Sequence, residues 1–213
     1  MTERISRIVS EIPETKVFGD IGCDHGYAAY EMLKRGKCEY AVLSDVSAKC
    51  LKKAEDLLFD YVKEKKAIAI VSDGFDFLPH LDTALIAGMG GEEIISILKN
   101  AKELPESLIL QPMKNVEKVR VFVVKNGYRV EKDYVFYCGN KYYNLLTLKK
   151  GEDRLSEEEI EFGRTNLKEK SADFKKMIGE EMKKLLMFAE NSPEKVAQEL
   201  KSKAERLKKY VED

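Results

Sequence analysis

The sequence of 213 residues contains no tryptophan, only two histidines and only four cysteines. Cys23, Cys38, Cys50 and Cys138 form no CxxC pair, which argues against a disulfide scaffold or a structural zinc site and is typical of reduced cytosolic thiols. No apolar run approaches the roughly 18 residues of a membrane span, and residues 1–16 lack the apolar centre of a signal peptide. We therefore expect a soluble, cytoplasmic protein that uses neither a membrane nor a metal.

A strong net charge is also absent, since 37 Lys and Arg residues balance 38 Asp and Glu residues. Any nucleic-acid partner must therefore be held by a local patch. Residues 101–150 contain ten basic and five acidic side chains, which indicates one such patch. Its candidate phosphate contacts are Lys114, Lys118, Arg120, Lys125, Arg129 and Lys132, to which a C-terminal segment adds Lys168, Lys175, Lys183 and Lys184.

Apolar residues make up 44% of the chain, enough for a sizeable core, and their pattern predicts an α/β fold. Short apolar runs typical of buried parallel strands occur at residues 17–21, 40–45, 67–71, 83–88 and 108–111. Amphipathic stretches typical of helices lie between and after these runs, at residues 26–36, 47–62, 91–102 and 115–126. Two β-rich segments at 128–138 and 141–150, joined by Gly139-Asn140, predict a closing antiparallel hairpin and a seven-stranded sheet.

The composition changes near residue 152, where we place a boundary between an α/β domain (1–152) and a C-terminal helical hairpin (153–213). Ser156 and Glu159 form a capping box, and a stripe from Ile160 to Leu185 predicts one long helix. Ser192 as N-cap and Pro193 at the first helical position begin a second helix. The pair could contact an RNA or mediate self-association.

The first strand leads into a turn, Asp20-Ile21-Gly22-Cys23-Asp24-His25-Gly26, that opens a helix. Backbone N–H groups in such a turn lie beside a ligand. The turn is not the GxGxxG dinucleotide motif, and the acidic Asp24 would repel a pyrophosphate. A ligand with a cationic centre suits the turn better, and a dehydrogenase is disfavoured.

Carboxylates follow three successive strands and point to the parts of one ligand. Asp45 ends the second strand at the offset where an acidic residue meets a ribose diol, and Asp73-Gly74 follows the third strand, where it can accept from an exocyclic amine. Each alone could be a helix cap. Together with the first turn they match an amino acid, a ribose and an adenine, which S-adenosylmethionine combines with a sulfonium cation.

The fourth strand ends in Ala87-Gly88-Met89-Gly90-Gly91, where small residues allow a flat base to approach the backbone. An ordinary connection between strand and helix is the alternative. Met89 can pack in the core or touch a ligand.

DIGCDHGY, the strand-end Asp45, SDGF, IAGMGG and LILQP, in this order, resemble the bacterial tRNA (adenine-22-N1)-methyltransferase family. The resemblance implies a class I methyltransferase domain with a Rossmann-like sheet, followed by a helical coiled coil. It also implies that S-adenosylmethionine is bound by Asp20, Gly22, Asp24, Asp45, Asp73, Gly74, Gly88, Met89 and Gly90, and that tRNA is the partner.

The reaction that the resemblance implies needs no general base, because adenine N1 carries a lone pair and no proton. The site must align N1 with the methyl carbon and stabilise the positive charge that spreads onto the ring. Asp24 is the first catalytic candidate and His25 the second. Tyr27 can stack on a base that has been flipped out of the tRNA, or simply pack in the core.

Two other functions fit the same residues. A small-molecule S-adenosylmethionine-dependent methyltransferase would use the same turn but would not need a basic surface or a helical hairpin. A non-enzymatic S-adenosylmethionine-binding interaction protein would bind the ligand without methylating tRNA.

Overall fold

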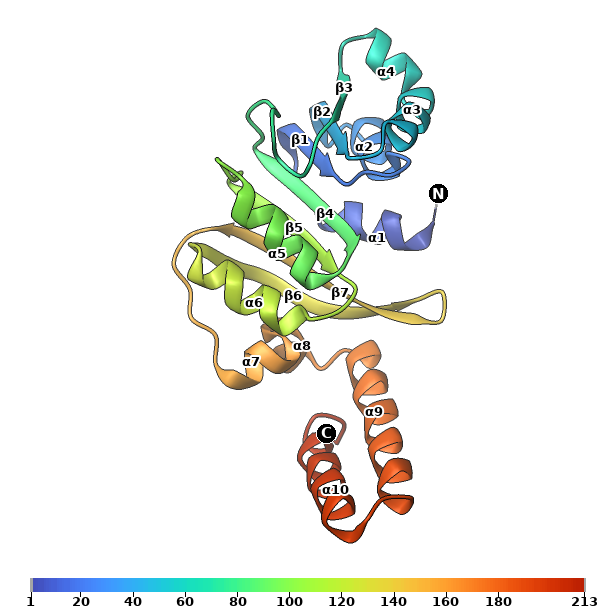
Figure 1. The fold of residues 1–213 in the computed structure, drawn as a ribbon, viewed down its shortest axis with the longest axis vertical. Coiled ribbons are helices and arrows are strands. Elements are labelled where there is room, and N and C mark those ends of the chain that lie inside the picture. Colours follow the sequence, from blue (N-terminus) through green and yellow to red (C-terminus); the bar gives the residue numbers. More distant parts are fainter. Residues whose placement is uncertain (1, 213) are drawn as a thin grey trace.

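The computed structural model describes residues 2–212 and contains one seven-stranded sheet in the order β3-β2-β1-β4-β5-β7-β6 (Figure 1). The strands are β1 (Thr15–Ile21), β2 (Cys38–Asp45), β3 (Ala67–Val71), β4 (Thr83–Met89), β5 (Ser107–Pro112), β6 (Tyr128–Cys138) and β7 (Lys141–Lys150). β1 to β5 are parallel, and β7 pairs antiparallel with β5 and β6. The predicted sheet and its closing hairpin are confirmed, with Gly139 and Asn140 both at positive φ in the turn.

Helices cover both faces of the sheet. α2 (Tyr27–Lys34), α3 (Ala48–Leu57) and α4 (Phe59–Lys63) lie on one face, and α5 (Gly91–Asn100) and α6 (Val116–Lys125) lie on the other. Alternate strand residues feed the two cores, as Leu85 and Ile86 do from β4. The single helix expected over residues 47–62 is divided at Leu58, where the backbone leaves helical angles (φ −97°, ψ 18°) while the side chain stays in the core.

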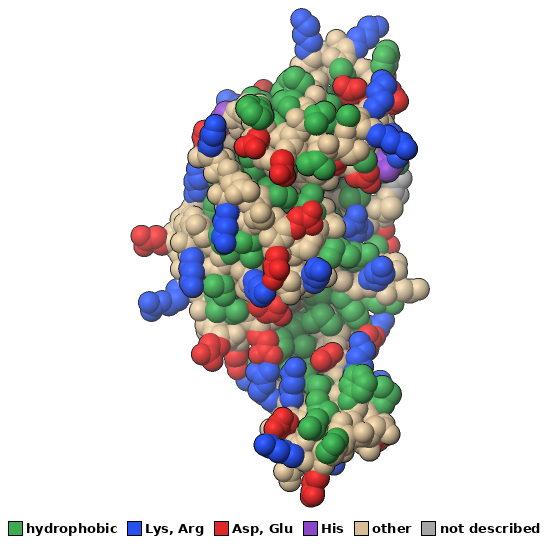
Figure 2. Space-filling view, in the orientation of Figure 1, with side chains coloured by type: hydrophobic (Ala, Val, Ile, Leu, Met, Phe, Trp, Pro, Cys, Tyr) green, Lys and Arg blue, Asp and Glu red, His purple; other side chains and the backbone are tan. Residues whose placement is uncertain are grey.

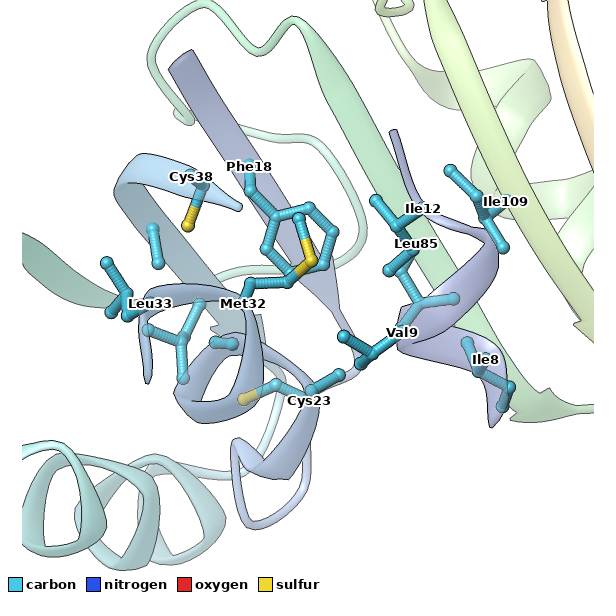
Figure 3. Packing of buried hydrophobic residues seen from close by; sticks show 14 of the residues in the cluster. Ile8, Val9, Ile12, Phe18, Cys23, Met32, Leu33, Cys38, Leu85 and Ile109 are labelled. Atoms are coloured by element: carbon cyan, nitrogen blue, oxygen red, sulfur yellow. The ribbon is translucent and has the colours of Figure 1, made fainter. Parts of the chain in front are cut away.

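A helix that the sequence interpretation did not predict, α1 (Glu3–Glu11), precedes the sheet. Ile8, Val9 and Ile12 are almost fully buried against α2 and the sheet, beside Leu85 and Ile109 (Figure 3). The helix begins after Thr2, whose hydroxyl accepts from the Ile5 amide. Burial of this apolar face fixes α1 over the β1, β4 and β5 region of the sheet.

The expected long C-terminal helix is wrong, because the chain forms three helices: α7 (Glu157–Phe162), α8 (Arg164–Glu169) and α9 (Ala172–Glu190). Gly163 (φ 88°) and Lys170 (φ 44°) interrupt the helical path. A Cβ at Gly163 would lie 2.8 Å from Asp133 and 2.9 Å from Arg120, so the glycine lets the chain cross this pair. The capping box of Ser156 and Glu159 is confirmed.

α10 (Glu194–Lys208) folds back beside α9, which confirms the helical pair (Figure 1). Its N-cap is Pro193 rather than the expected Ser192, whose hydroxyl instead donates to the Phe188 carbonyl at 2.8 Å. The coiled-coil geometry of the pair stays a prediction. Within the described residues, no helix combines the length and apolar character that a membrane crossing requires.

C-terminal side chains cover the outer edge of β6, the last strand of the sheet. The backbone amides of Val130, Asp133, Val135 and Tyr137 donate to side-chain oxygens of Asp153, Thr165, Asn166 and Asp173, respectively, at 2.9–3.0 Å. Such caps prevent pairing of the edge with another strand. The domain boundary at residue 152 stays a prediction, and these bonds join its two sides.

Candidate active site

The carboxyl ends of β1 to β5 form the edge where the strand order reverses around β1, the usual ligand-binding crevice of open α/β sheets. Two cavities lie there, of about 390 Å³ and about 90 Å³. Gly22 and Met89 line both of them. Gly22 has a φ of 67°, a left-handed conformation that a residue with a side chain would adopt only with strain, so glycine is favoured where the two cavities meet.

The turn after β1 is fixed by hydrogen bonds to the end of β2. The amides of Gly22 and Cys23 both donate to the Ser44 carbonyl, at 2.8 and 3.0 Å. The Asp24 amide donates to Asp45 Oδ2 at 3.1 Å, and Asp24 itself has the left-handed φ of 50°. The turn is therefore held in place before any ligand binds.

The smaller cavity gathers three residues that the sequence assigned to one ligand: Asp45, Asp73 and Gly74. Asp45 is half-buried, and its Oδ1 accepts from the Ser47 amide at 2.8 Å while Oδ2 accepts from Asp24. Ser47 in turn caps α3. The carboxylate of Asp45 thus organises the cavity wall as well as facing the cavity.

The larger cavity contains the other predicted side chains, among them Asp20, Asp24, His25 and Tyr27. Asp20 is buried and accepts from the Ala29 amide at 3.1 Å. Burial raises the pKa of Asp20 to about 7. The hydrogen bond from Ala29 lowers this pKa, and the nearby Asp45 charge raises it. A buried acid of this kind favours a cationic ligand group beside it.

Asp24 and His25 form a hydrogen-bonded pair at the cavity. His25 Nδ1 lies 2.8 Å from Asp24 Oδ2, and Lys53 Nζ lies 3.3 Å from His25 Nε2. Since an ammonium can only donate, Nε2 is the acceptor and Nδ1 carries the proton. Desolvation alone would raise the pKa of Asp24. Hydrogen bonds from His25 and Cys50, together with the Lys53 charge, outweigh this effect and lower the pKa of Asp24. Asp24 is therefore a carboxylate at neutral pH.

Tyr27 stands at the start of α2 with 43% of its surface exposed, and its ring stacks on His25 with centroids 5.7 Å apart. This exposure contradicts packing of Tyr27 as a core aromatic and leaves a ring face for a planar ligand. Cys23 also lines the cavity, but burial raises the pKa of its thiol, so the thiolate needed for a covalent mechanism is disfavoured.

The glycine loop after β4 is only partly in the site. Gly88 and Met89 line the larger cavity, whereas Gly90 is the N-cap of α5. A Cβ on Gly91 would lie 2.6 Å from the Lys114 carbonyl, so Gly91 serves close packing of the backbone.

Three residues near the site escaped the sequence interpretation: Arg4, Lys53 and Gln111. Arg4 lies on α1, and Lys53 contacts His25 from α3. Gln111 is the penultimate residue of β5 and is fully buried, and its Oε1 accepts from Arg4 Nη1 at 2.8 Å. The spacing of Ile5, Ile8, Val9 and Ile12 is the signal that could have revealed α1.

The expected basic surface is smaller than its sequence suggests. The prediction that Arg120 contacts phosphate is wrong, because Arg120 is 1% exposed and paired with Asp133. Lys118, Arg129 and Lys132 are exposed but paired with Glu92, Glu131 and Glu11, respectively. Acidic and basic side chains are interspersed over the face in Figure 2. In residues 2–212, no group of three or more His, Cys, Asp or Glu side chains is placed to hold a metal ion.

Known proteins resemble this chain in sequence and in fold. The Bacillus subtilis tRNA (adenine(22)-N(1))-methyltransferase is 25% identical over 223 residues, which cover 97% of this chain and 94% of the relative. A Mycoplasma pneumoniae protein provisionally named a tRNA methyltransferase is 38% identical over 136 residues, 61% of this chain and 62% of that protein. The match therefore spans less than two thirds of the Mycoplasma relative.

Solved structures give the same picture of the fold. The B. subtilis m1A22 tRNA methyltransferase TrmK superposes with a TM-score of 0.82 at 24% identity, covering 100% of this chain and 99% of that one. M. capricolum TrmK in complex with S-adenosyl-homocysteine gives 0.86 at 23% identity, covering 99% and 97%. The family model of tRNA (adenine(22)-N(1))-methyltransferases matches residues 18–213. The chain belongs to the tRNA (adenine(22)-N(1))-methyltransferase family.

Proposed function

We propose that this protein transfers a methyl group from S-adenosylmethionine to N1 of the adenine at position 22 of a tRNA. The observation that carries the proposal is the pair of adjoining cavities at the carboxyl edge of β1 to β4: the smaller suits the nucleoside of the cofactor, and the larger suits its amino-acid end and a base. Family membership supports the reaction, and the lining of the cavities supports this arrangement of the reactants.

The residues present fit S-adenosylmethionine. Asp45, Asp73 and Gly74 in the smaller cavity suit the ribose hydroxyls and the adenine amine, both of which donate to carboxylate or carbonyl oxygens. The bare backbone of Gly22 and the buried acid Asp20 suit the amino-acid end and its cationic groups. When bound there, the cofactor supplies an electrophilic methyl group.

The target adenine belongs in the larger cavity, where Tyr27 offers a ring face and Gly88 offers backbone without a side chain. N1 is buried in a stacked or paired base, so the nucleotide has to leave the helix before it can react. Stacking on Tyr27 compensates part of the lost base stacking.

The chain's own contribution to the chemistry is placement and charge. N1 has no proton to lose, and its methylation makes the adenine ring cationic. The Asp24 carboxylate, held ionised by His25 and Lys53, faces the cavity where that charge develops and stabilises it. His25 keeps Asp24 in position and supports the Tyr27 ring.

The rest of the tRNA has to be held outside the cavities. Exposed lysines of α9, such as Lys183 and Lys184, provide positive charge that suits the phosphate backbone. In this proposal the protein works in the cytoplasm, where tRNA is found. Self-association through α9 and α10 remains a separate prediction, to be measured by light scattering.

Transfer of a labelled methyl group tests the function directly. The protein is incubated with methyl-labelled S-adenosylmethionine and either tRNA, adenosine or AMP. Label in tRNA, with none in the two small molecules, supports the proposal. Label in a small molecule alone favours the small-molecule methyltransferase, and cofactor binding without any transfer favours the non-enzymatic interaction protein.

A further inference from the structure

Arg4 stands at the larger cavity, beside Gly88 at the end of β4. The carboxylates of Asp73 and Asp45 follow the ends of β3 and β2, whereas Arg4 contacts residues at the ends of β4 and β5. A Cβ on Gly88 would lie 3.6 Å from Arg4 Nη1, and the same nitrogen donates to Gln111 Oε1 at 2.8 Å. In the sheet order, Arg4 is thus on the far side of β1 from Asp45 and Asp73.

Neutral groups alone orient the Arg4 guanidinium. Gln111 is fully buried at the end of β5, and the Tyr143 ring lies 5.5 Å below the guanidinium carbon. No carboxylate within residues 2–212 forms an ion pair with Arg4, whereas Arg35, Arg120 and Arg164 are all paired with acids. The charge of Arg4 is therefore held in place without being neutralised.

Two walls of the larger cavity carry opposite charge. The wall from β1 and α2 carries Asp20 and Asp24, and Arg4 is the one Lys or Arg side chain among the described lining residues. A cation close to N1 would oppose the positive charge that develops on the ring, so Arg4 is unsuited to the base itself. An anionic group is the ligand that this wall fits, and the two sources are a phosphate attached to the base and the carboxylate at the amino-acid end of the cofactor.

We propose that Arg4 binds a phosphate of the flipped target nucleotide and that Gln111 is the residue that positions it. The inference rests on the proposed function, because it takes a tRNA nucleotide as the occupant of the cavity. An arginine recognises phosphate through charge-assisted and often bidentate hydrogen bonds, which the fixed guanidinium is arranged to give. Gln111 lies in the LILQP segment, for which the reaction itself leaves no role.

Salt dependence of tRNA binding tests Arg4. Each phosphate contact adds about 0.7 (single strand) to 0.9 (duplex) to the slope of log affinity against log salt concentration. Arg4→Ala should lower the slope by about this amount and weaken binding about tenfold or more. Arg4→Lys should restore the slope, since it keeps the charge. Arg7→Ala is the matched control, because Arg7 lies on the same helix over an aromatic ring but does not line this cavity.

The outcomes distinguish failure of the Arg4–phosphate contact from failure of the proposed function. An unchanged slope in Arg4→Ala, or an equal fall in Arg7→Ala, would overturn the phosphate contact at the cavity. Weaker binding of S-adenosylmethionine to Arg4→Ala by calorimetry would instead assign Arg4 to the cofactor carboxylate and also overturn it. Absence of tRNA binding by the unmodified protein would remove the proposed function together with this inference.

A double-mutant cycle tests Gln111. Gln111→Met keeps the buried volume but removes the oxygen that accepts from Arg4. We expect a several-fold fall in kcat/KM for tRNA with unchanged cofactor affinity, and no further fall when Gln111→Met is added to Arg4→Ala. Additive effects of the two substitutions would show that Gln111 acts only in the fold of β5 and would overturn its positioning role.

Discussion

His25 Nδ1 lies 2.8 Å from Asp24 Oδ2, and Lys53 approaches the opposite ring nitrogen of His25. This arrangement leaves Asp24 as an anion beside the cavity and makes His25 a hydrogen-bond donor to it. The pair is suited to a reaction in which a neutral base becomes a cation, since a fixed negative charge favours the product side of the transfer.

Asp24→Asn should lower kcat for tRNA methylation about tenfold or more while the Kd for S-adenosylmethionine stays nearly constant. Asparagine tolerates the left-handed backbone of this position, so the turn is preserved. Single-turnover kinetics and calorimetry provide the two measurements. A weakened cofactor affinity with normal kcat would place Asp24 in the cofactor site instead.

Asp45→Ala should raise the Kd for S-adenosylmethionine about tenfold, equivalent to about 1.4 kcal/mol. The substitution removes the acceptor of the Asp24 and Ser47 amides, and with it the proposed ribose contact. Calorimetry measures the effect, with Asp56→Ala as the control, because Asp56 is an exposed carboxylate on α3 that pairs with Lys52 and lines neither cavity. An unchanged Kd in a folded variant would exclude the ribose contact.

Affinity for S-adenosylmethionine should rise with pH between about 5.5 and 7.5, because the cationic ligand binds the ionised form of Asp20, whose pKa is raised to about 7. In the absence of ligand, the contribution of Asp20 to the stability of the protein depends on pH with the opposite sign. The folded state holds this proton more tightly than the unfolded chain, so unfolding free energy falls as pH rises from about 4 to 7. Asp20→Asn should flatten the affinity profile measured by calorimetry. A profile that keeps its slope in this variant would assign it to another group.

Arg120→Met should destabilise the protein by about 3–5 kcal/mol, because it leaves the buried carboxylate of Asp133 without its partner. Arg120 also donates to the Ile160 and Glu161 carbonyls and so joins α6 to α7. Urea denaturation measures the loss. The double variant Arg120→Met with Asp133→Leu should lose less than the single one, and an equal or greater loss would show that the charge pair is not the cause.

The sequence predicted the seven strands and the turn after β1 because these rely on local patterns. Apolar runs identify the buried strands, and the spacing of Asp20, Gly22 and Gly26 fits a tight turn between strand and helix. The carboxylates at the ends of β2 and β3 could be placed at one edge for the same reason. The pattern could not show that both oxygens of Asp45 hold backbone amides.

Features that depend on distant contacts were missed. Arg4 and Gln111 are 107 residues apart, and no local signal relates them. The helix expected over 156–185 breaks because Gly163 must pass the buried pair of Arg120 and Asp133, whose burial is a tertiary property. The same burial explains why Arg120, which lies in a charged stretch of the sequence, is unavailable to a phosphate.

The position of the methyl group on tRNA tests the central claim most directly. Two tRNA transcripts, one with A22 and one with G22, are incubated with the protein and S-adenosylmethionine, and the products are mapped by nuclease digestion and mass spectrometry. We predict one 1-methyladenosine at position 22 of the first transcript and no methylation of the second. Methylation at another position, an equal yield from both transcripts, or no transfer to either would contradict the proposed function.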